Sequence, residues 1–357
     1  MVLVGGGCVG DREISNPPDH TNTMDMGDET FDPVNVQFRA EICDARAWGI
    51  TPDTKDVALT VVRTPAGASV LSVPRDGGAV RGFRVDNRGD LFDRDVHTIR
   101  EDRNYTGVTA SMVADRLVVA SLVDDKVALD IVSDDLAARH DLGDVSGTLI
   151  TPVVSSRENQ LAFVGSANGV VANSFSGGLW TPTGESDVTK ASIVSLTAQN
   201  FHDDALVTFS TTTHECHMKH IATGREAVFR DGCDNARMAV DPATGKGVLI
   251  YEQSGNVRMN LLRINGNKEI SDEVQVFEQA SSPRASFDGG HVWVSYLDAR
   301  GDIVVGFIDP DGNLKSRSLE GFRPGGAYDL SAFGSGHWVV GVHDSAFLSE
   351  RICAVRE

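Results

Sequence analysis

Seven short apolar segments recur along the chain and set its organisation. Each holds alternating or continuous apolar residues, a pattern typical of a β-strand that packs into a core. Their central residues are Leu59, Val119, Phe163, Val207, Ile250, Val294 and Val340. Five of the six intervals between these residues span 43 to 46 positions, and the first interval spans 60. We assign the excess of the first interval to an inserted loop within residues 88–105.

Turn residues divide each repeat into four strands. In the sixth repeat, the turns Asp288-Gly289-Gly290 and Asp-Pro-Asp-Gly at 309–312 separate apolar segments. Aspartate, glycine and proline supply the backbone angles that tight turns require. The strands expected in this repeat are 283–287, 291–297, 303–308 and 314–319. Elsewhere no long apolar period of 3.6 residues occurs, and only residues 134–140 are compatible with a short helix.

The repeats predict an all-β chain that folds as a seven-bladed β-propeller with four-stranded blades. A four-stranded sheet cannot bury both of its faces alone, so the blades stack around an axis and the closed ring covers the last exposed flank. The alternative is a β-sandwich in which the regular spacing is a coincidence.

The two ends of the chain are expected to close the ring together. The last repeat supplies strands at 327–333, 337–343 and 349–355 and then lacks a fourth strand. Residues 35–43 form one alternating strand too many ahead of the first repeat. We therefore expect this N-terminal strand to be the outer strand of the last blade, with residues 34–357 forming a single domain.

The first eight residues resemble the tail of a bacterial lipoprotein signal peptide, because three small residues precede Cys8. The resemblance implies that Cys8 carries a lipid. The sequence departs from the usual pattern because Gly5 stands where leucine is common. Residues 9–33 are polar and acidic with no apolar period, so we expect a disordered tether. The alternative is a leader in which Cys8 has no role.

Composition narrows the range of functions. The formal net charge is −19, from 32 basic and 51 acidic residues, which argues against a nucleic-acid partner because phosphate binding requires a basic surface. No run of about 18 apolar residues is present, so we expect membrane attachment through the lipid anchor alone.

Apart from Cys8 the chain has four cysteines, and an even number favours an oxidising compartment. The blade pattern favours one of the three possible pairings. Cys43 and Cys233 each end an outermost strand, and Cys216 and Cys353 each lie on a third strand. With a four-residue loop at 223–226, residue 216 would face residue 233. We predict Cys216–Cys233 within one blade and Cys43–Cys353 across the ring closure. The alternative is four free thiols in a cytosolic protein.

Three arginines precede or begin what the repeats predict to be innermost strands: Arg46, Arg237 and Arg284. In a propeller these positions lie near the mouth of the central channel. We therefore assign them to a candidate site for an anionic ligand, since arginine forms paired hydrogen bonds with carboxylates and similar groups. The alternative is that each arginine forms a structural ion pair with a neighbouring aspartate, namely Asp44, Asp234 and Asp288.

Residues 286–293 match the S-x-D-x-G-x-x-W pattern that sialidase-type propellers repeat, with Ser286, Asp288, Gly290 and Trp293 at the defining positions. The resemblance would imply a glycosidase. Here the pattern occurs once, between the first and second strands of a blade rather than between the third and fourth. A sialidase also needs a tyrosine nucleophile with a carboxylate partner, and none of the four tyrosines stands in such a pattern. We therefore predict no catalytic residues.

Three histidines stand close together in the sequence: His214, His217 and His220. On a strand, His214 and His220 face one side and His217 the other, so the three cannot share a metal ion without distortion. We predict no metal and no cofactor.

Together these features predict a secreted or lipid-anchored, monomeric protein of the bacterial envelope, in the periplasm or at the outer membrane. Residues 34–357 resemble the propeller lipoproteins of Gram-negative envelopes in architecture. The resemblance is architectural and carries no catalytic motif, and we predict a binding or scaffold module whose ligand is an unidentified protein or glycan. The alternatives are a carbohydrate-active propeller, either hydrolase or lectin, that uses the arginines, and a purely structural protein.

Overall fold

A computed structural model describes residues 38–356 of the chain, except for 114–115, 152–153, 156–159, 177–180, 203, 265–268, 310, 334–335 and 345. The expected signal tail at 1–8 with Cys8, and the expected tether at 9–33, lie outside the described residues. Within the described part there are strands and no α-helix, and therefore no helix that could cross a membrane.

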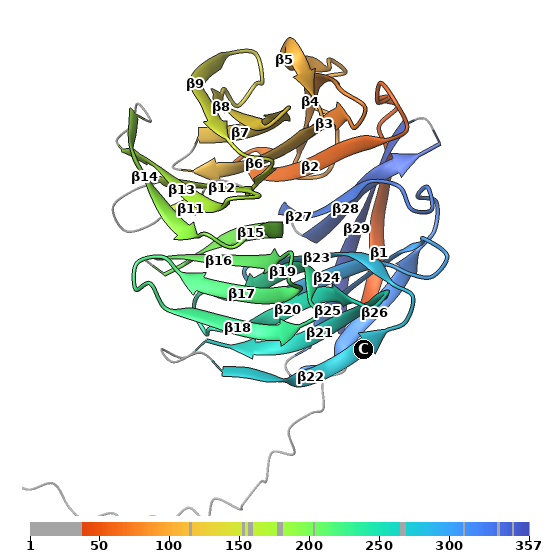
Figure 1. The fold of residues 1–357 in the computed structure, drawn as a ribbon. Helices are drawn as coiled ribbons and strands as arrows, with labels where there is room; N and C mark the ends of the chain where they lie inside the picture. The colour runs from red at the N-terminus through yellow and green to blue at the C-terminus, as the bar shows by residue number, and fades with distance from the viewer. Residues whose placement is uncertain are drawn as a thin grey trace, which may run out of the picture. The chain divides into compact units, whose positions relative to one another are not determined.

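Seven antiparallel sheets follow one another around a ring and form the blades of a β-propeller (Figure 1). Blade 1 comprises β2 (Val57–Thr64), β3 (Gly67–Pro74), β4 (Gly78–Asp86) and β5 (His97–Tyr105). Blade 2 comprises β6 (Gly107–Val113), β7 (Arg116–Val123), β8 (Lys126–Val132) and β9 (Arg139–Ser146). Blade 3 comprises β10 (Leu149–Ile150), β11 (Val154–Ser155), β12 (Gln160–Ser166), β13 (Gly169–Ser176) and β14 (Thr181–Thr189). In blade 3 the innermost position is shared by β10 and β11, which both pair with β12.

Blades 4 to 7 follow the same plan. Blade 4 comprises β15 (Ile193–Phe201), β16 (Asp204–Thr211), β17 (Glu215–His220) and β18 (Glu226–Asp231), and blade 5 comprises β19 (Asp234–Val240), β20 (Lys246–Gln253), β21 (Asn256–Arg263) and β22 (Glu269–Phe277). Blade 6 comprises β23 (Ser281–Phe287), β24 (Val292–Leu297), β25 (Ile303–Ile308) and β26 (Leu314–Leu319). Blade 7 comprises β27 (Tyr328–Phe333), β28 (Gly336–His343), β29 (Ala346–Arg356) and β1 (Phe38–Ala47). The predicted seven-bladed, four-stranded propeller is confirmed.

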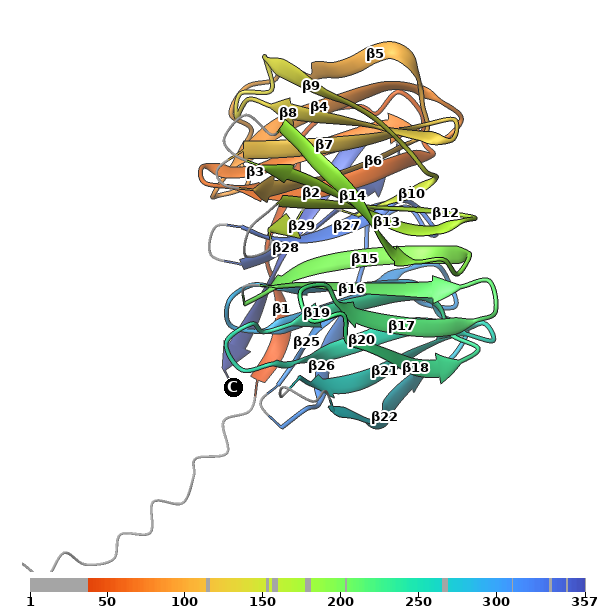
Figure 2. The ribbon, with the colours of Figure 1, turned by 60° about the vertical axis from the view of Figure 1, so that its left-hand side comes forward.

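The N-terminal strand closes the ring as predicted. β1 pairs antiparallel with β29, so blade 7 has the order β1-β29-β28-β27, and the orange β1 lies among the blue strands of this blade (Figures 1 and 2). A disulfide joins Cys43 to Cys353 across this pair, with their Cα atoms 6.1 Å apart. The two ends of the described chain are therefore held together by both a strand ladder and a covalent bond.

The second predicted disulfide, Cys216–Cys233, is also present, with a Cα separation of 5.5 Å. The register predicted for it is wrong. His217 faces Val228, so a bulge leaves Cys233 beyond the end of β18, where its amide donates to the carbonyl of His214 at 2.8 Å. The sulfur reaches Cys216 from the connection to blade 5 rather than from a facing ladder position. Two disulfides indicate an oxidising compartment.

The long first interval in the sequence pattern comes from a misassigned strand. Leu59 lies on β2, the innermost strand of blade 1, whereas the other six segments lie on second strands. The second strands begin at residues 67, 116, 160, 204, 246, 292 and 336, which are 42 to 49 residues apart. The assignment of the excess to an inserted loop was therefore wrong. The same shift places Arg46 on β1, an outermost strand.

The hydrophobic core is divided among the seven interfaces between neighbouring blades. For example, one cluster joins Val85 of blade 1 to Trp338 of blade 7, and another joins Tyr251 of blade 5 to Met218 of blade 4. Each of the seven clusters draws its buried residues from two adjacent blades. A blade is therefore stable only where it contacts its neighbours.

The two disulfides should respond differently to reductant. Cys43 is exposed, whereas Cys216 and Cys233 are fully buried. Mild reduction of the folded protein followed by alkylation should label Cys43 and Cys353 first, as mass spectrometry would show. Opening the closure, which spans 310 residues, should lower the free energy of unfolding in urea by about 5–6 kcal/mol in the chain-entropy treatment. Preferential labelling of Cys216 and Cys233, or unchanged stability, would contradict this assignment.

Candidate functional site

Two of the three predicted arginines come together on adjacent blades. Arg237 lies on β19 and Arg284 on β23, the innermost strands of blades 5 and 6. Both side chains are half-buried. Burial, and after it the positive charge of Arg284, lowers the pKa of Arg237 to about 10. The two cations are therefore close enough to repel each other, and we call them the arginine pair.

The arginine pair is held by backbone carbonyls. The Nη1 of Arg237 donates to the carbonyl of Ala236 and the Nη1 of Arg284 donates to that of Pro283, each at 3.0 Å. The Arg284 guanidinium also lies 5.5 Å from the ring centre of Tyr328 on β27. Among the described residues, neither arginine forms an ion pair within 4.0 Å. A guanidinium has five N–H donors, so most donors of the pair have no protein acceptor in this part of the chain.

The carboxylates nearest the arginine pair are engaged in joining blades. Asp329 accepts a 2.8 Å hydrogen bond from the amide of Val61 in blade 1, and burial raises its pKa although Arg284 opposes that shift. Glu252 accepts from the amide of Ser282 at 2.7 Å, which joins blade 5 to blade 6. These acids moderate the positive potential, but they accept hydrogen bonds from backbone amides, and Glu252 also from the Asn235 side chain at 2.9 Å, rather than from the guanidinium groups.

A small cavity gives access to one member of the pair. Arg284 and Tyr328 line a cavity of about 110 Å³ between blades 6, 7 and 1. Asp56 and Arg75 also line this cavity and pair with each other at 3.2 Å. A cavity of this size has room for a small charged group such as a carboxylate beside Arg284.

Tyr328 is a poor candidate for a nucleophile. Its hydroxyl donates to the carbonyl of Ser282 at 2.7 Å and lies 3.4 Å from the Ser295 hydroxyl. Burial raises its pKa to about 12, which disfavours the tyrosinate form. The tyrosine therefore positions Arg284 and joins blade 7 to blade 6, and the arrangement is suited to binding an anion rather than to attacking a sugar.

Arg46 does not join the arginine pair. It lies on the outermost strand of blade 7, where it pairs with Asp44 at 2.9 Å and Asp90 at 3.5 Å. The ion-pair alternative therefore describes Arg46. For the arginine pair the suggested partners are wrong, because Asp234 contacts His214 at 3.0 Å and Asp288 is used within its own turn.

The sialidase-like residues 286–293 form the turn between β23 and β24, where the sequence placed them. Asp288 accepts hydrogen bonds from the amides of Gly290 and His291 at 2.8 and 2.7 Å, and from the Trp293 indole at 2.6 Å. Burial alone would raise the pKa of Asp288, but these hydrogen bonds hold it below its usual value. These hydrogen bonds stabilise a hairpin, and Asp288 also lies 3.9 Å from the His337 imidazole of blade 7, so the motif has a local structural role.

The three histidines face separate carboxylates. His214 lies 3.0 Å from Asp234, His217 lies 2.8 Å from Glu226, and His220 lies 3.6 Å from Asp204. Within the described ranges no three potential ligands are grouped for a metal ion.

Sequence reasoning missed the residues that surround the arginine pair. Tyr328, Asp329 and Glu252 come from two blades and from both first and second strands, so no spacing in the chain links them. The sequence could have indicated Tyr328 and Asp329, because they occupy the start of the last innermost strand. That strand is equivalent to the strands that carry Arg237 and Arg284.

Comparisons with known proteins show the fold alone. No protein-family model matches this sequence, and no curated protein matches it. Among solved structures, the chain is similar to a chain of the hydrazine synthase of Kuenenia stuttgartiensis, with a TM-score of 0.61 and 10% sequence identity. The match covers 86% of this chain and 97% of that chain. At this sequence identity the structural similarity supports the propeller fold but gives no information about the activity of this chain.

The stability of the protein should depend on pH because of His337, which lies beside the turn at Asp288. This imidazole is fully buried, stacks on Trp293 with ring centres 4.8 Å apart, and has no hydrogen-bond partner among the described residues. Burial lowers its pKa to about 3, although Asp288 acts in the opposite direction. Below pH 6.5 the unfolded state therefore binds a proton that the folded state excludes, and stability falls by about 1.4 kcal/mol per pH unit from this residue.

Urea unfolding at pH 7, 5.5 and 4.5 tests whether His337 causes this pH dependence of stability. The variant His337→Phe should lose less stability than the parent protein over that range, because it has no proton to exclude. His343→Phe, at an exposed position on the same strand, should keep the parental dependence. Equal slopes for the parent and His337→Phe would show that His337 is not the source.

Proposed function

We propose that the protein is a binding module of the bacterial cell envelope that recognises an acidic group on a protein or glycan through Arg237 and Arg284. Attachment through a lipid on Cys8, in the periplasm or at the outer membrane, is part of this proposal. The two disulfides support it because they favour an oxidising compartment.

One observation carries the proposal. Arg237 and Arg284 are half-buried, mutually repulsive and lack an ion pair within the described residues. Removing cations from water is costly unless they are paired, so an arrangement of this kind is stabilised when an anion enters it. Carboxylate, sulfate and phosphate groups match the planar donor set of a guanidinium.

A carbohydrate-active role is the second candidate, and the geometry favours its lectin form. The arginine pair and the cavity beside Arg284 would suit the carboxylate of an acidic sugar. Hydrolysis would require an activated nucleophile or a pair of carboxyl groups. Tyr328 has its hydroxyl proton directed to a carbonyl, and Asp329 and Glu252 are engaged with backbone amides. A purely structural role would have predicted paired arginines, which is the situation of Arg46 alone among the three.

Binding to an array of acidic glycans, with the matched neutral glycans beside them, tests the proposal. The parent protein should be retained on acidic members, and retention should fall as salt is raised. In calorimetric titration with a retained glycan, Arg237→Gln and Arg284→Gln should each weaken affinity at least tenfold.

Matched controls distinguish an effect at the arginine pair from a general effect of removing positive charge. Arg300→Gln, whose side chain is 73% exposed, and Arg46→Gln remove the same charge elsewhere and should leave affinity within twofold. An acidic protein fraction of envelope extract, used in place of the glycans, separates a protein ligand from a glycan. Equal loss in all four variants, or retention unaffected by the two site variants, would exclude the arginine pair as the binding site.

A further inference from the structure

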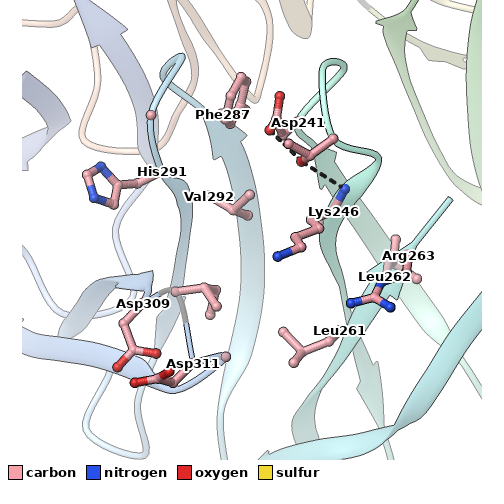
Figure 3. A pocket seen from close by; sticks show the side chains of 15 residues that line it. Asp241, Lys246, Leu261, Leu262, Arg263, Phe287, His291, Val292, Asp309 and Asp311 are labelled. Carbon is pink, nitrogen blue, oxygen red and sulfur yellow. Dashed lines mark hydrogen bonds between the residues drawn. The ribbon is translucent and has the colours of Figure 1, made fainter. Parts of the chain in front are cut away.

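A second, larger cavity lies between blades 5 and 6, away from the arginine pair. Its volume is about 670 Å³, within the range of small-molecule sites. One wall comes from β20 and β21 with the turn before β20, and the other from β23 to β25 with the turn after β25 (Figure 3).

The base of the cavity is apolar. Leu261, Val292 and Ile308 line it, together with Phe287. In Figure 3, Leu261 and Val292 project from the two blades into the space between them. Because an apolar surface of this kind gains free energy when a ligand displaces water, the middle of a ligand here should be hydrophobic.

Charged side chains line both sides of the cavity. Lys246 and Arg263 lie on the blade 5 side together with Asp241, whereas Asp309 and Asp311 lie on the blade 6 side (Figure 3). The side chains of Lys246 and Asp311 are exposed and make no ion pair or hydrogen bond within the described part of the chain. A ligand with a negative group at one end and a positive group at the other would pair with both side chains.

The other carboxylates of the cavity are used by its turns. Asp241 accepts from the Thr244 hydroxyl at 2.5 Å. Asp309 accepts from the amide of Asn313 at 2.8 Å and lies 3.6 Å from the Lys315 ammonium. Asp311 is thus the acid that remains available, and Lys246 is the base opposite it. The three aspartates of the lining, which also holds Lys246, Arg263 and His291, disfavour a ligand that is only anionic.

We propose that this cavity binds a short apolar peptide with free ends. The peptide carboxylate contacts Lys246, the terminal ammonium contacts Asp311, and apolar side chains cover Leu261, Val292 and Ile308. An extended peptide lengthens by about 3.3–3.6 Å per residue, so only lengths that match the separation of the two charges satisfy both ends. This site and its ligand are independent of the arginine pair.

Calorimetric titration with Leu-Leu, Leu-Ala-Leu and Leu-Ala-Ala-Leu tests the proposal on the full chain. At least one length should bind. N-acetylation or C-amidation of that peptide should each weaken affinity at least tenfold, because each modification removes one terminal charge.

Variants assign each end of the peptide. Lys246→Met should weaken binding of the free peptide tenfold but should not further weaken the C-amidated peptide. Asp311→Asn should behave in the same way toward the N-acetylated peptide. Lys190→Met and Asp344→Asn, at side chains 85% and 87% exposed elsewhere, should match the parent protein, as should Arg284→Gln.

The proposal would be overturned if no free peptide binds, or if the affinity is indifferent to the blocking groups. Binding that Lys246→Met and Asp311→Asn leave unchanged would place the peptide elsewhere and would also overturn it. Circular dichroism of each variant confirms that the propeller is intact, so that a loss of affinity reports on the cavity.

Discussion

Burial of apolar surface between neighbouring blades is the interaction on which this structure depends. Each of the seven core clusters needs residues from two blades, so an incomplete ring would leave two of these faces in water. The closure of the ring is therefore the contact that matters most for stability. There β1 completes blade 7, Phe38 packs against Phe307 of blade 6 with ring centres 6.4 Å apart, and Cys43–Cys353 fixes the strand pair.

The fold was predictable because second strands are buried on both faces and give continuous apolar runs such as Val248-Leu249-Ile250. The same signal could not separate the first strand from the second in blade 1, since Val57, Val61 and Val62 of β2 are also buried. Register in blade 4 failed for a local reason. The bulge between Glu215 and His217 depends on backbone geometry that residue types do not specify.

The candidate site was predictable only in part, because its members come from several blades. Arg237 and Arg284 were found through their equivalent places in successive repeats, and Arg46 was included because the first innermost strand was misplaced. Tyr328, Asp329 and Glu252 converge on the pair only after the ring has formed. A charge's partners are set by the arrangement of blades, so the distinction between a paired and an unpaired arginine needed the structure.

Arg100 shows how this protein stabilises an arginine that serves the fold. Its side chain is buried between blades 1 and 2, where it contacts both carboxylate oxygens of Asp130 at 2.5 and 2.9 Å and the Tyr105 hydroxyl at 3.0 Å. Breaking such a pair would leave a buried charge and cost about 3–5 kcal/mol. Arg237 and Arg284 instead donate to backbone carbonyls, and the nearby carboxylates of Glu252 and Asp329 are hydrogen-bonded elsewhere. That arrangement gives up stability that a carboxylate partner would supply, and the anionic ligand proposed above would restore it.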